Sequence, residues 1–347
     1  MKKTKNEIAP IDREAEAAAR ARQAQLTKPA GALGRLEEIA CWLAGRQGRE
    51  IPRPLVPHIM VFAADHGVAA QGVSAYPPEV TAEMVRNFAR GGAAINVLAR
   101  AIGAEVTVVD VGVAAELGDL PAIVHAKVRP GSRDLSRGAA LSPEEWEQAV
   151  AVGRRVAATA IDAGATLLLP GDMGIGNTTP SACLICHLTG APPEAVVGRG
   201  TGIDDATRAR KVAVVAAAVD RAATLSGVAA MAAVGGLEIG AIAGCFLEAA
   251  ARGIPAVVDG FIAAAGGLAA AAVAPGVEEW LLASHRSQER GHAIALERLA
   301  LTPLVDLGLR LGEGSGAALI VPLLQAAVAL HAEMATFAEA GVSGANE

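Results

Sequence analysis

The segment 171-GDMGIGNTTPSA-182 combines glycines, hydroxyl groups and an amide at the expected start of a helix. Glycine lets a backbone approach a ligand closely, and the free amides of a helix N-terminus favour an anion. Asn177, Thr178 and Thr179 add side-chain donors. The pattern fits a cradle for a phosphate or carboxylate, and it fits a tight strand-to-helix turn equally well. It matches neither a Walker A loop nor the dinucleotide fingerprint.

Two further glycine clusters stand before predicted helices. The first, 198-GRGTGIDD-205, precedes a helix that carries several basic residues, including Lys211, and a basic residue beside a glycine turn suits a phosphate. Taken alone, a plain loop with a solvated helix face explains it better. The second, 310-RLGEGSGAA-318, places Glu313 between two glycines. Burial would raise the pKa of this carboxyl group toward that of a general base, although spacing alone favours an acidic residue in a helix's first turn.

Other concentrated polar residues point less clearly to chemistry. The Cys183-x-x-Cys186-His187 pattern matches haem attachment, but Cys183 falls on the core side of a predicted helix, and no second ligand pair has zinc spacing. We therefore expect no metal site. Asp65-His66 and 284-SHRSQERGH-292 are expected to shape a pocket or satisfy loop backbone, because no nucleophile elbow accompanies them.

The elements that position these loops alternate between buried strands and helices. Strands are predicted at 59–65, 105–113, 166–172 and 254–260. Helices are predicted at 12–26, 33–43, 78–101, 143–163, from 179, at 206–226, at 237–252, and as one long helix from 316. The 143–163 helix begins with a capping box of Ser142 and Glu145. The alternation predicts an α/β fold with a mostly parallel sheet.

Ligands of such sheets bind at the carboxyl ends of the strands. Three polar or glycine-rich loops follow predicted strands, at 65–67, 171–179 and 259–260, so we expect them to open on the same edge. Their convergence is the first functional signal in the sequence.

Composition excludes several classes of protein. The chain has 347 residues, of which 52% are hydrophobic and 3% aromatic, enough for one large domain with an appendage or for two domains. The best uninterrupted apolar run, Gly260 to Val273, is shorter than the roughly 18 residues a membrane span needs. The N-terminus has no secretory pattern. The net charge of −6 without a long basic run disfavours nucleic acid, and four cysteines make no disulfide scaffold. We expect a soluble cytoplasmic protein.

Five segments in order make the sequence similar to the nicotinate-nucleotide–dimethylbenzimidazole phosphoribosyltransferase family. They are 27-TKPAGALGRLE-37, 64-ADHGVAAQGVSAYPPEVT-81, 91-GGAAINVLA-99, 171-GDMGIGNTT-179 and 312-GEGSGAA-318. The resemblance implies transfer of the 5-phosphoribosyl group of nicotinate mononucleotide to a benzimidazole nitrogen. The products would be nicotinate and α-ribazole 5′-phosphate, for the nucleotide loop of cobalamin. It implies a homodimer and no cofactor, because the cationic pyridine nitrogen already leaves well.

The resemblance also implies roles for individual residues. Glu313 matches the family's proton acceptor. The 5′-phosphate would be held by Gly174, Gly176, Asn177, Thr178, Gly200, Thr201, Gly202 and Lys211, with Asp259, Gly260 and Ser287 near the ribose or nicotinate. The aromatic base would lie between Ser74, Tyr76, Met173 and Leu311. The implied fold is a Rossmann-like sheet flanked by helices (54–320), with a small helical subdomain formed from the chain ends (1–50 plus 321–347).

The sequence departs from the family at a few positions. Asp172 stands where the family usually has Glu; a carboxylate there could stabilise positive charge developing at C1′, and the shorter side chain affects geometry and rate more than reaction type. Ala30-Gly31-Ala32 replaces Pro-Gly-Ser, and 131–140 lacks an expected Asn-Phe or Asn-Ile pair. The base could be 5,6-dimethylbenzimidazole, a substituted benzimidazole, a purine or a phenolic.

Two alternatives remain. One is a nucleotide-binding sensor or carrier that kept the pocket and lost the chemistry; Glu313 argues against it, because a binder needs no base there. The other is a dinucleotide-dependent enzyme on the same sheet, which needs a glycine fingerprint that Asp65-His66-Gly67 does not supply.

Overall fold

A six-stranded parallel sheet forms the centre of the protein, whose computed structural model describes residues 7–118, 120–200 and 202–343. The strands are β1 (Pro57–Ala64), β2 (Glu105–Gly112), β3 (Ile123–His125), β4 (Leu167–Met173), β5 (Ala256–Val258) and β6 (Leu281–Ala283). Their order is β3-β2-β1-β4-β5-β6. The first three strands therefore extend from β1 toward one edge of the sheet, and β4, β5 and β6 then extend from β1 toward the other edge. The predicted α/β fold with a parallel sheet is confirmed. The strand order reverses between β1 and β4, where such sheets bind ligands.

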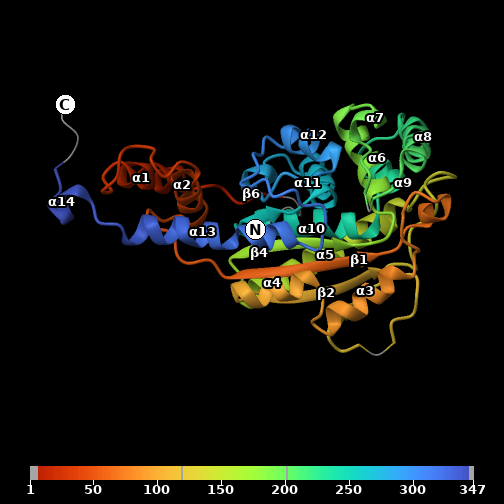
Figure 1. Ribbon diagram of the computed structural model, residues 1–347, viewed down its shortest axis with the longest axis horizontal. Coiled ribbons are helices and arrows are strands. Elements are labelled where there is room, and N and C mark those ends of the chain that lie inside the picture. Colours follow the sequence, from red (N-terminus) through yellow and green to blue (C-terminus); the bar gives the residue numbers. More distant parts are fainter. Residues whose placement is uncertain (1–6, 119, 201, 344–347) are drawn as a thin grey trace.

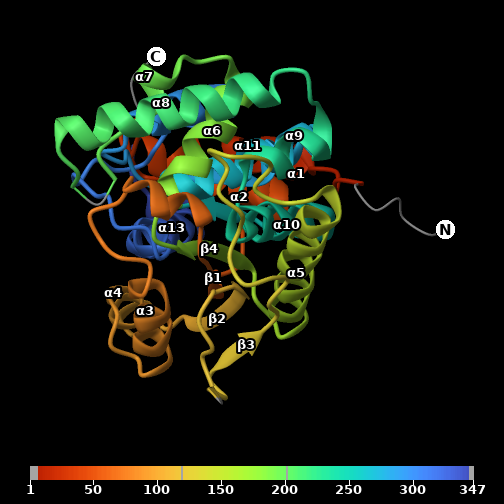
Figure 2. The ribbon, with the colours of Figure 1, turned by 90° about the vertical axis from the view of Figure 1, so that its right-hand side faces the viewer.

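Helices cover both faces of this sheet (Figure 2). On one side lie α3 (Val80–Ala89), α4 (Ala94–Ile102) and α13 (Ser315–Glu333). On the other lie α5 (Pro143–Asp162), α6 (Thr178–Thr189), α7 (Pro193–Val196), α8 (Asp205–Ala222), α9 (Gly227–Val234), α10 (Leu237–Arg252), α11 (Phe261–Val273) and α12 (Arg290–Arg298). Because strand side chains alternate, Met60 and Phe62 enter one core while Ile59 and Val61 enter the other. All of β1 is buried, as its apolar run predicts.

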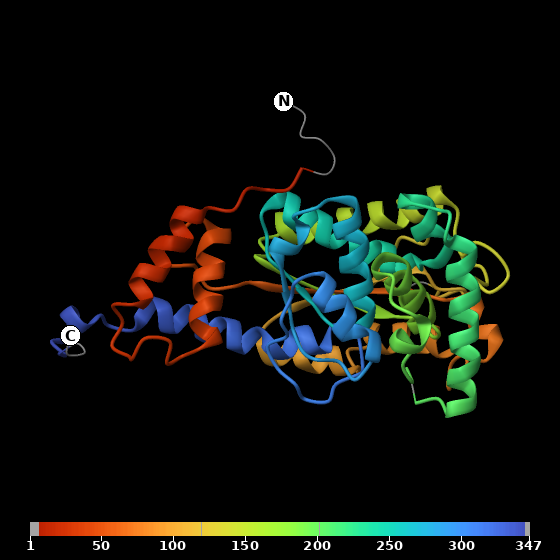
Figure 3. The ribbon, with the colours of Figure 1, turned by 90° about the horizontal axis from the view of Figure 1, so that it is seen from above.

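The chain ends pack together beside the sheet. The helices α1 (Arg13–Gln23) and α2 (Arg35–Gln47) lie along the C-terminal half of α13, and α14 (Phe337–Ala340) follows it (Figures 1 and 3). The Gln23 side chain lies 2.8 Å from His331 Nδ1, and Arg22 donates to the His331 carbonyl at 3.0 Å. The division into domains at 54–320 and at 1–50 plus 321–347 stays a prediction.

Several element boundaries differ from the prediction. The single helix expected at 78–101 is wrong: it divides into α3 and α4 at Gly91, whose φ is 78°. The helix expected at 206–226 ends at Ala222, and the expected single C-terminal helix ends at Glu333. The short strands β3 and β6 and the helices α11 and α12 were not predicted. The capping box of Ser142 and Glu145 is confirmed.

Helix α13 has the length and apolar composition of a membrane span. The sequence analysis did not predict this, because polar residues and a proline interrupt the apolar residues of the helix. In this structure 56% of the apolar stretch of α13 is buried inside the protein. A core helix has the same length and composition, and α13 packs against α2, α4 and β4.

Candidate active site

The loops that follow the central strands meet at the carboxyl edge of the sheet. The cavity between them is bordered by the predicted residues Asp172, Asn177, Thr178, Gly200, Gly260, Ser287 and Leu311. It is also bordered by His285 and Glu289 of the 284–292 segment, which was expected to shape a pocket, and by Arg310 and Gly312 of the 310–318 segment. Phe261 and Ile262 border it as well, and the sequence analysis did not single them out. The loops at 171–179 and 259–260 therefore open on one edge, as predicted.

A turn before α13 lies directly on strand β4. A Cβ atom on Gly171 would lie 2.3 Å from the carbonyl carbon of Glu313, so only glycine admits this contact. The Glu313 amide donates to the Asp172 carbonyl at 3.3 Å. Glu313 has φ 62° between Gly312 and Gly314, which also have positive φ. A non-glycine residue in this region is uncommon and often marks a functional position.

The Glu313 side chain is buried behind the cavity rather than bordering it directly. Its Oε2 accepts a hydrogen bond from the Ile95 amide, at the N-terminus of α4, at 3.3 Å. Burial raises the pKa of Glu313, and the Ile95 amide opposes the rise. The expectation of an ordinary acid in a helix's first turn is wrong, because α13 begins at Ser315 and Gly314 caps it.

Two more buried carboxyl groups lie beside Glu313. Asp172 Oδ2 accepts from Asn177 Nδ2 at 2.8 Å, while its Oδ1 finds no hydrogen-bond partner among the described residues. Burial, then the nearby Asp259 and Glu238 carboxylates, raises the pKa of Asp172 well above its usual range. Asp259 accepts from the backbone at the start of α13, and burial raises its pKa to about 7. We call this group of three (Asp172, Asp259 and Glu313) the acidic end of the site.

A buried cation lies behind another part of the cavity wall, against Thr178 and Gly200. Lys211 on α8 is 1% exposed, and its Nζ donates to Thr178 Oγ1 at 2.5 Å. A Cβ on Gly200 would lie 3.6 Å from that Nζ, so the glycine brings backbone close to the ammonium group. Burial lowers the pKa of Lys211 to about 8, and the Glu289 carboxylate partly opposes this. Lys211, Thr178 and Gly200 form the basic end.

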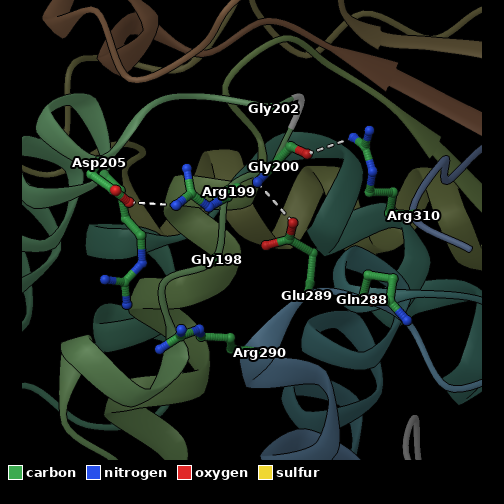
Figure 4. A pocket seen from close by; sticks show the side chains of 10 residues that line it. Gly198, Arg199, Gly200, Gly202, Asp205, Gln288, Glu289, Arg290 and Arg310 are labelled. Carbon is green, nitrogen blue, oxygen red and sulfur yellow. Dashed lines mark hydrogen bonds and ion pairs between the residues drawn. The ribbon is translucent and has the colours of Figure 1, made fainter. Parts of the chain in front are cut away.

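Glu289 occupies part of the basic end in this structure. Its Oε1 accepts a hydrogen bond from the Gly200 amide at 2.7 Å, and its Oε2 is buried without a partner among the described residues. A Cβ on Gly198 would lie 2.0 Å from that Oε2. Figure 4 shows the carboxylate turned toward Gly200, whose carbonyl accepts from Arg310 at 3.3 Å. Glu289 belongs to the 284–292 segment that was expected to shape a pocket, but its contact with Gly200 was not predicted, because no spacing links residue 289 to residue 200.

An arginine-rich pocket adjoins the basic end (Figure 4). Arg199, Arg208, Arg290 and Arg310 border it. It shares Gly200, Glu289 and Arg310 with the cavity already described. Clustered positive charge of this kind attracts anions and raises their local concentration.

The remaining predicted phosphate residues are spread around these ends. Gly174 lies against β1, because a Cβ there would be 2.3 Å from the Ala64 carbonyl oxygen, and Gly176 has φ 88°. Gly202 borders the arginine-rich pocket, while Thr201 lies outside the described residues.

The predicted base-slot residues are not brought together around the cavity. Ser74 and Tyr76 lie in the loop before α3, where Tyr76 is 54% exposed and its amide donates to Ser74 Oγ. Met173 is half-buried against the core that contains α13, and only Leu311 borders the cavity, with 56% of its surface exposed. Their shared role stays a prediction.

The cysteine pattern is part of the core of α6. Cys183 and Cys186 are buried, and burial raises the pKa of Cys186 to about 12, which keeps the thiol protonated. Among the residues that the structure describes, no group of three His, Cys, Asp or Glu could hold a metal ion.

Comparison with known proteins identifies the family. A family model described as Phosphoribosyltransferase matches residues 8–342. The chain belongs to this phosphoribosyltransferase family. It is 62% identical over 341 residues to the nicotinate-nucleotide–dimethylbenzimidazole phosphoribosyltransferase of Chromobacterium violaceum, covering 98% of this chain and 99% of that protein. It is 54% identical to the protein of the same name from Chloroflexus aggregans, covering 100% and 99%.

A solved structure agrees with this assignment. The chain matches the crystal structure of CobT from Thermus thermophilus with a TM-score of 0.93 and 53% identity, covering 96% of this chain and 100% of that one. A phosphoribosyltransferase has to hold a phosphate at a fixed distance from the anomeric carbon where bonds exchange. One cavity of this protein is bordered by residues of both the basic end and the acidic end.

Proposed function

We propose that this phosphoribosyltransferase moves the 5-phosphoribosyl group of nicotinate mononucleotide to 5,6-dimethylbenzimidazole or a related base. The products are α-ribazole 5′-phosphate and nicotinate, for the nucleotide loop of cobalamin. The names of the Chromobacterium and Chloroflexus relatives support the substrates. The observation that carries the proposal is a cavity bordered by the buried carboxyl group of Asp172 and by Thr178 and Gly200, behind which the Lys211 ammonium group is buried.

The donor has charges that match this arrangement. Its phosphate is anionic and its pyridinium is cationic, so Lys211, Thr178 and the Gly200 amide would bind the phosphate. The pyridinium and C1′ would lie toward Asp172. Each ligand charge favours the charged form of the group that it meets, because opposite charges offset the cost of burial. The phosphate has to displace the Glu289 carboxylate from the Gly200 amide.

The acceptor nitrogen attacks C1′ on the face opposite the nicotinate. The bond from C1′ to the pyridinium nitrogen breaks, and its electron pair stays on that nitrogen, which becomes neutral. The benzimidazole then carries a positive charge, which is removed when the proton on its other nitrogen passes to Glu313. The raised pKa of Glu313 suits this role, because a base works best with a pKa near the working pH.

Asp172 stabilises the positive charge that develops at C1′. Its Oδ2 is fixed by Asn177, which leaves the unpartnered Oδ1 for the sugar. A Cβ on Gly312 would lie 3.1 Å from both carboxylate oxygens, so the space beside them is narrow. Asp259 lies behind this turn and orients it through its bonds to the Gly314 and Ala317 amides. Gly260 and Ser287 border the sugar.

The remaining predictions complete the proposal. Gly174, Gly176, Asn177 and Gly202 support the phosphate loops, and Ser74, Tyr76, Met173 and Leu311 form the base slot. The enzyme acts as a cytoplasmic homodimer without a nucleic-acid or membrane partner; the net charge of −6 disfavours nucleic acid.

A product assay tests the reaction. The protein is incubated with nicotinate mononucleotide and 5,6-dimethylbenzimidazole, and both products are identified by mass spectrometry. We expect stoichiometric nicotinate and α-ribazole 5′-phosphate. Binding of the nucleotide without transfer to any aromatic base offered would instead make the protein a nucleotide sensor or carrier.

A further inference from the structure

His285 is a buried side chain that the reaction described above does not use. It follows strand β6, is 3% exposed, and borders the same cavity as Asp172 and Thr178. Its hydrogen bonds fix where its proton resides. The Ser284 hydroxyl donates to the Asp259 carbonyl at 2.8 Å, which uses its single proton. The 2.8 Å contact between Ser284 Oγ and His285 Nδ1 must therefore be donated by the imidazole.

This tautomer leaves a lone pair on Nε2. Burial lowers the pKa of His285, so the ring is neutral at physiological pH and Nε2 is an acceptor. No described residue donates a hydrogen bond to it. A Cβ on Gly260 would lie 4.0 Å from Nε2, and Gly260 also borders the cavity. The Cε1–Nε2 edge of the ring therefore lies toward Gly260, at the border of the cavity.

The ring cannot turn to offer its other edge. A Cβ on Gly316, in the first turn of α13, would lie 2.0 Å from His285 Nδ1, so the ring packs directly against that turn. The backbone of His285 is also held by a parallel bridge to Val305. A rigid acceptor selects its partner more sharply than a mobile one.

A neutral acceptor in this position requires a donor from the ligand. A phosphate and a nicotinate carboxylate are themselves acceptors and would be repelled. Sugar hydroxyl groups are the donors that a ribosyl phosphate offers. The ribose carries both the 5′-phosphate and the reacting carbon C1′, and His285 borders the same cavity as Thr178 and Gly200 of the basic end and Asp172 of the acidic end.

We propose that His285 Nε2 accepts a hydrogen bond from a ribose hydroxyl of the donor nucleotide and so selects ribosyl over deoxyribosyl donors. This role rests on the proposed function and adds a specificity residue to it. A site built to accept from a hydroxyl leaves its own acceptor unpaired when the hydroxyl is missing, which penalises the deoxy analogue.

The test compares kcat/KM for nicotinate mononucleotide with that for its 2′-deoxy and 3′-deoxy analogues. We expect the wild-type protein to prefer the ribosyl donor over one analogue by about tenfold or more. In His285→Ala that preference should fall to about twofold or less. An equal loss for all three donors would overturn the proposal. If the wild type transfers no ribosyl group at all, the proposed function fails first, which is a different result.

Two further variants and a spectroscopic measurement keep the test decisive. Ser284→Ala retains the imidazole but removes the group that fixes its tautomer, so donor preference should fall although the ring remains. His58→Ala is the matched control. His58 is a buried histidine at the amino end of β1, away from the carboxyl edge of the sheet where the cavity lies, so its loss should leave the preference unchanged. In wild type, ¹⁵N spectra should show His285 protonated at Nδ1 and its Nε2 signal shifted by nicotinate mononucleotide. Protonation at Nε2 instead would overturn the proposal.

Discussion

The two ends of the cavity respond to burial in opposite directions. At the basic end burial lowers the pKa of Lys211 to about 8, and at the acidic end it raises the pKa of Asp172 and Glu313. The cause is the same, since a low-dielectric site disfavours any charge. Each end therefore becomes charged most readily when a bound ligand places a group of opposite charge beside it. The proposed donor, with its anionic phosphate and cationic pyridinium, would satisfy both ends in a single orientation.

Removing the base at the acidic end should have the largest effect. Glu313→Gln keeps the shape but cannot take a proton, so kcat should fall by about 10² or more. The dissociation constant for nicotinate mononucleotide should change little, because the basic end is intact. Nicotinate release and equilibrium titration measure the two quantities. Glu297→Gln, on the exposed face of α12, is the matched control. A variant that keeps more than half of the wild-type kcat would exclude Glu313 as the base.

Removing the cation at the basic end should weaken donor binding instead. Lys211→Met fills the same space without charge, and KM for nicotinate mononucleotide should rise by about 10- to 100-fold, as expected for a lost hydrogen bond to a charged group. Nicotinate riboside, which lacks the phosphate, is the control donor, and its kcat/KM should stay the same. An equal loss for both donors would show that Lys211 does not bind the phosphate.

The pH dependence should separate the two ends. A lysine is charged below its pKa, so phosphate binding should be complete below about pH 8 and weaken as pH rises through that value. We expect kcat/KM for nicotinate mononucleotide to fall on the alkaline side. Lys211→Arg, whose guanidinium stays charged, should remove this limb. Persistence of the limb in the arginine variant would assign it to another group.

The smallest effect is expected from the carboxylate that occupies the basic end. Glu289→Gln removes the repulsion between that carboxylate and the incoming phosphate, so KM for nicotinate mononucleotide should fall by a few fold. Because Glu289 raises the pKa of Lys211, the alkaline limb should also move to lower pH. Steady-state kinetics at several pH values measure both shifts. A higher KM would mean that Glu289 supports the phosphate loop rather than competing with its ligand.

Much of the scaffold could be predicted because it depends on local pattern. The fully apolar strand β1 and the capping box at Ser142 are encoded within a few residues. The parallel sheet then requires the loops at 171–179 and 259–260 to meet. The break at Gly91 could not be predicted, since glycine is tolerated within helices and packing decides where one ends.

The site was only partly predictable, because some of its residues are marked by local pattern and others depend on contacts between distant parts of the sequence. Glu313 stands between glycines, a local signal that the structure links to a left-handed backbone. Glu289 and His285 stand in the polar segment 284–292, which was expected to shape a pocket, but their individual roles could not be predicted, because they depend on Gly200 and Gly316, which are distant in the sequence. Tyr76 is surface-exposed in this structure, and its place in a base slot remains a prediction.

The orientation of the donor is tested most directly by a crystal structure with nicotinate mononucleotide bound and no acceptor base. We predict that the phosphate accepts hydrogen bonds from Lys211 Nζ and the Gly200 amide, that Glu289 has left that amide, and that C1′ faces Asp172. A phosphate bound elsewhere, with Glu289 still on Gly200, would contradict the two-ended cavity as the donor site.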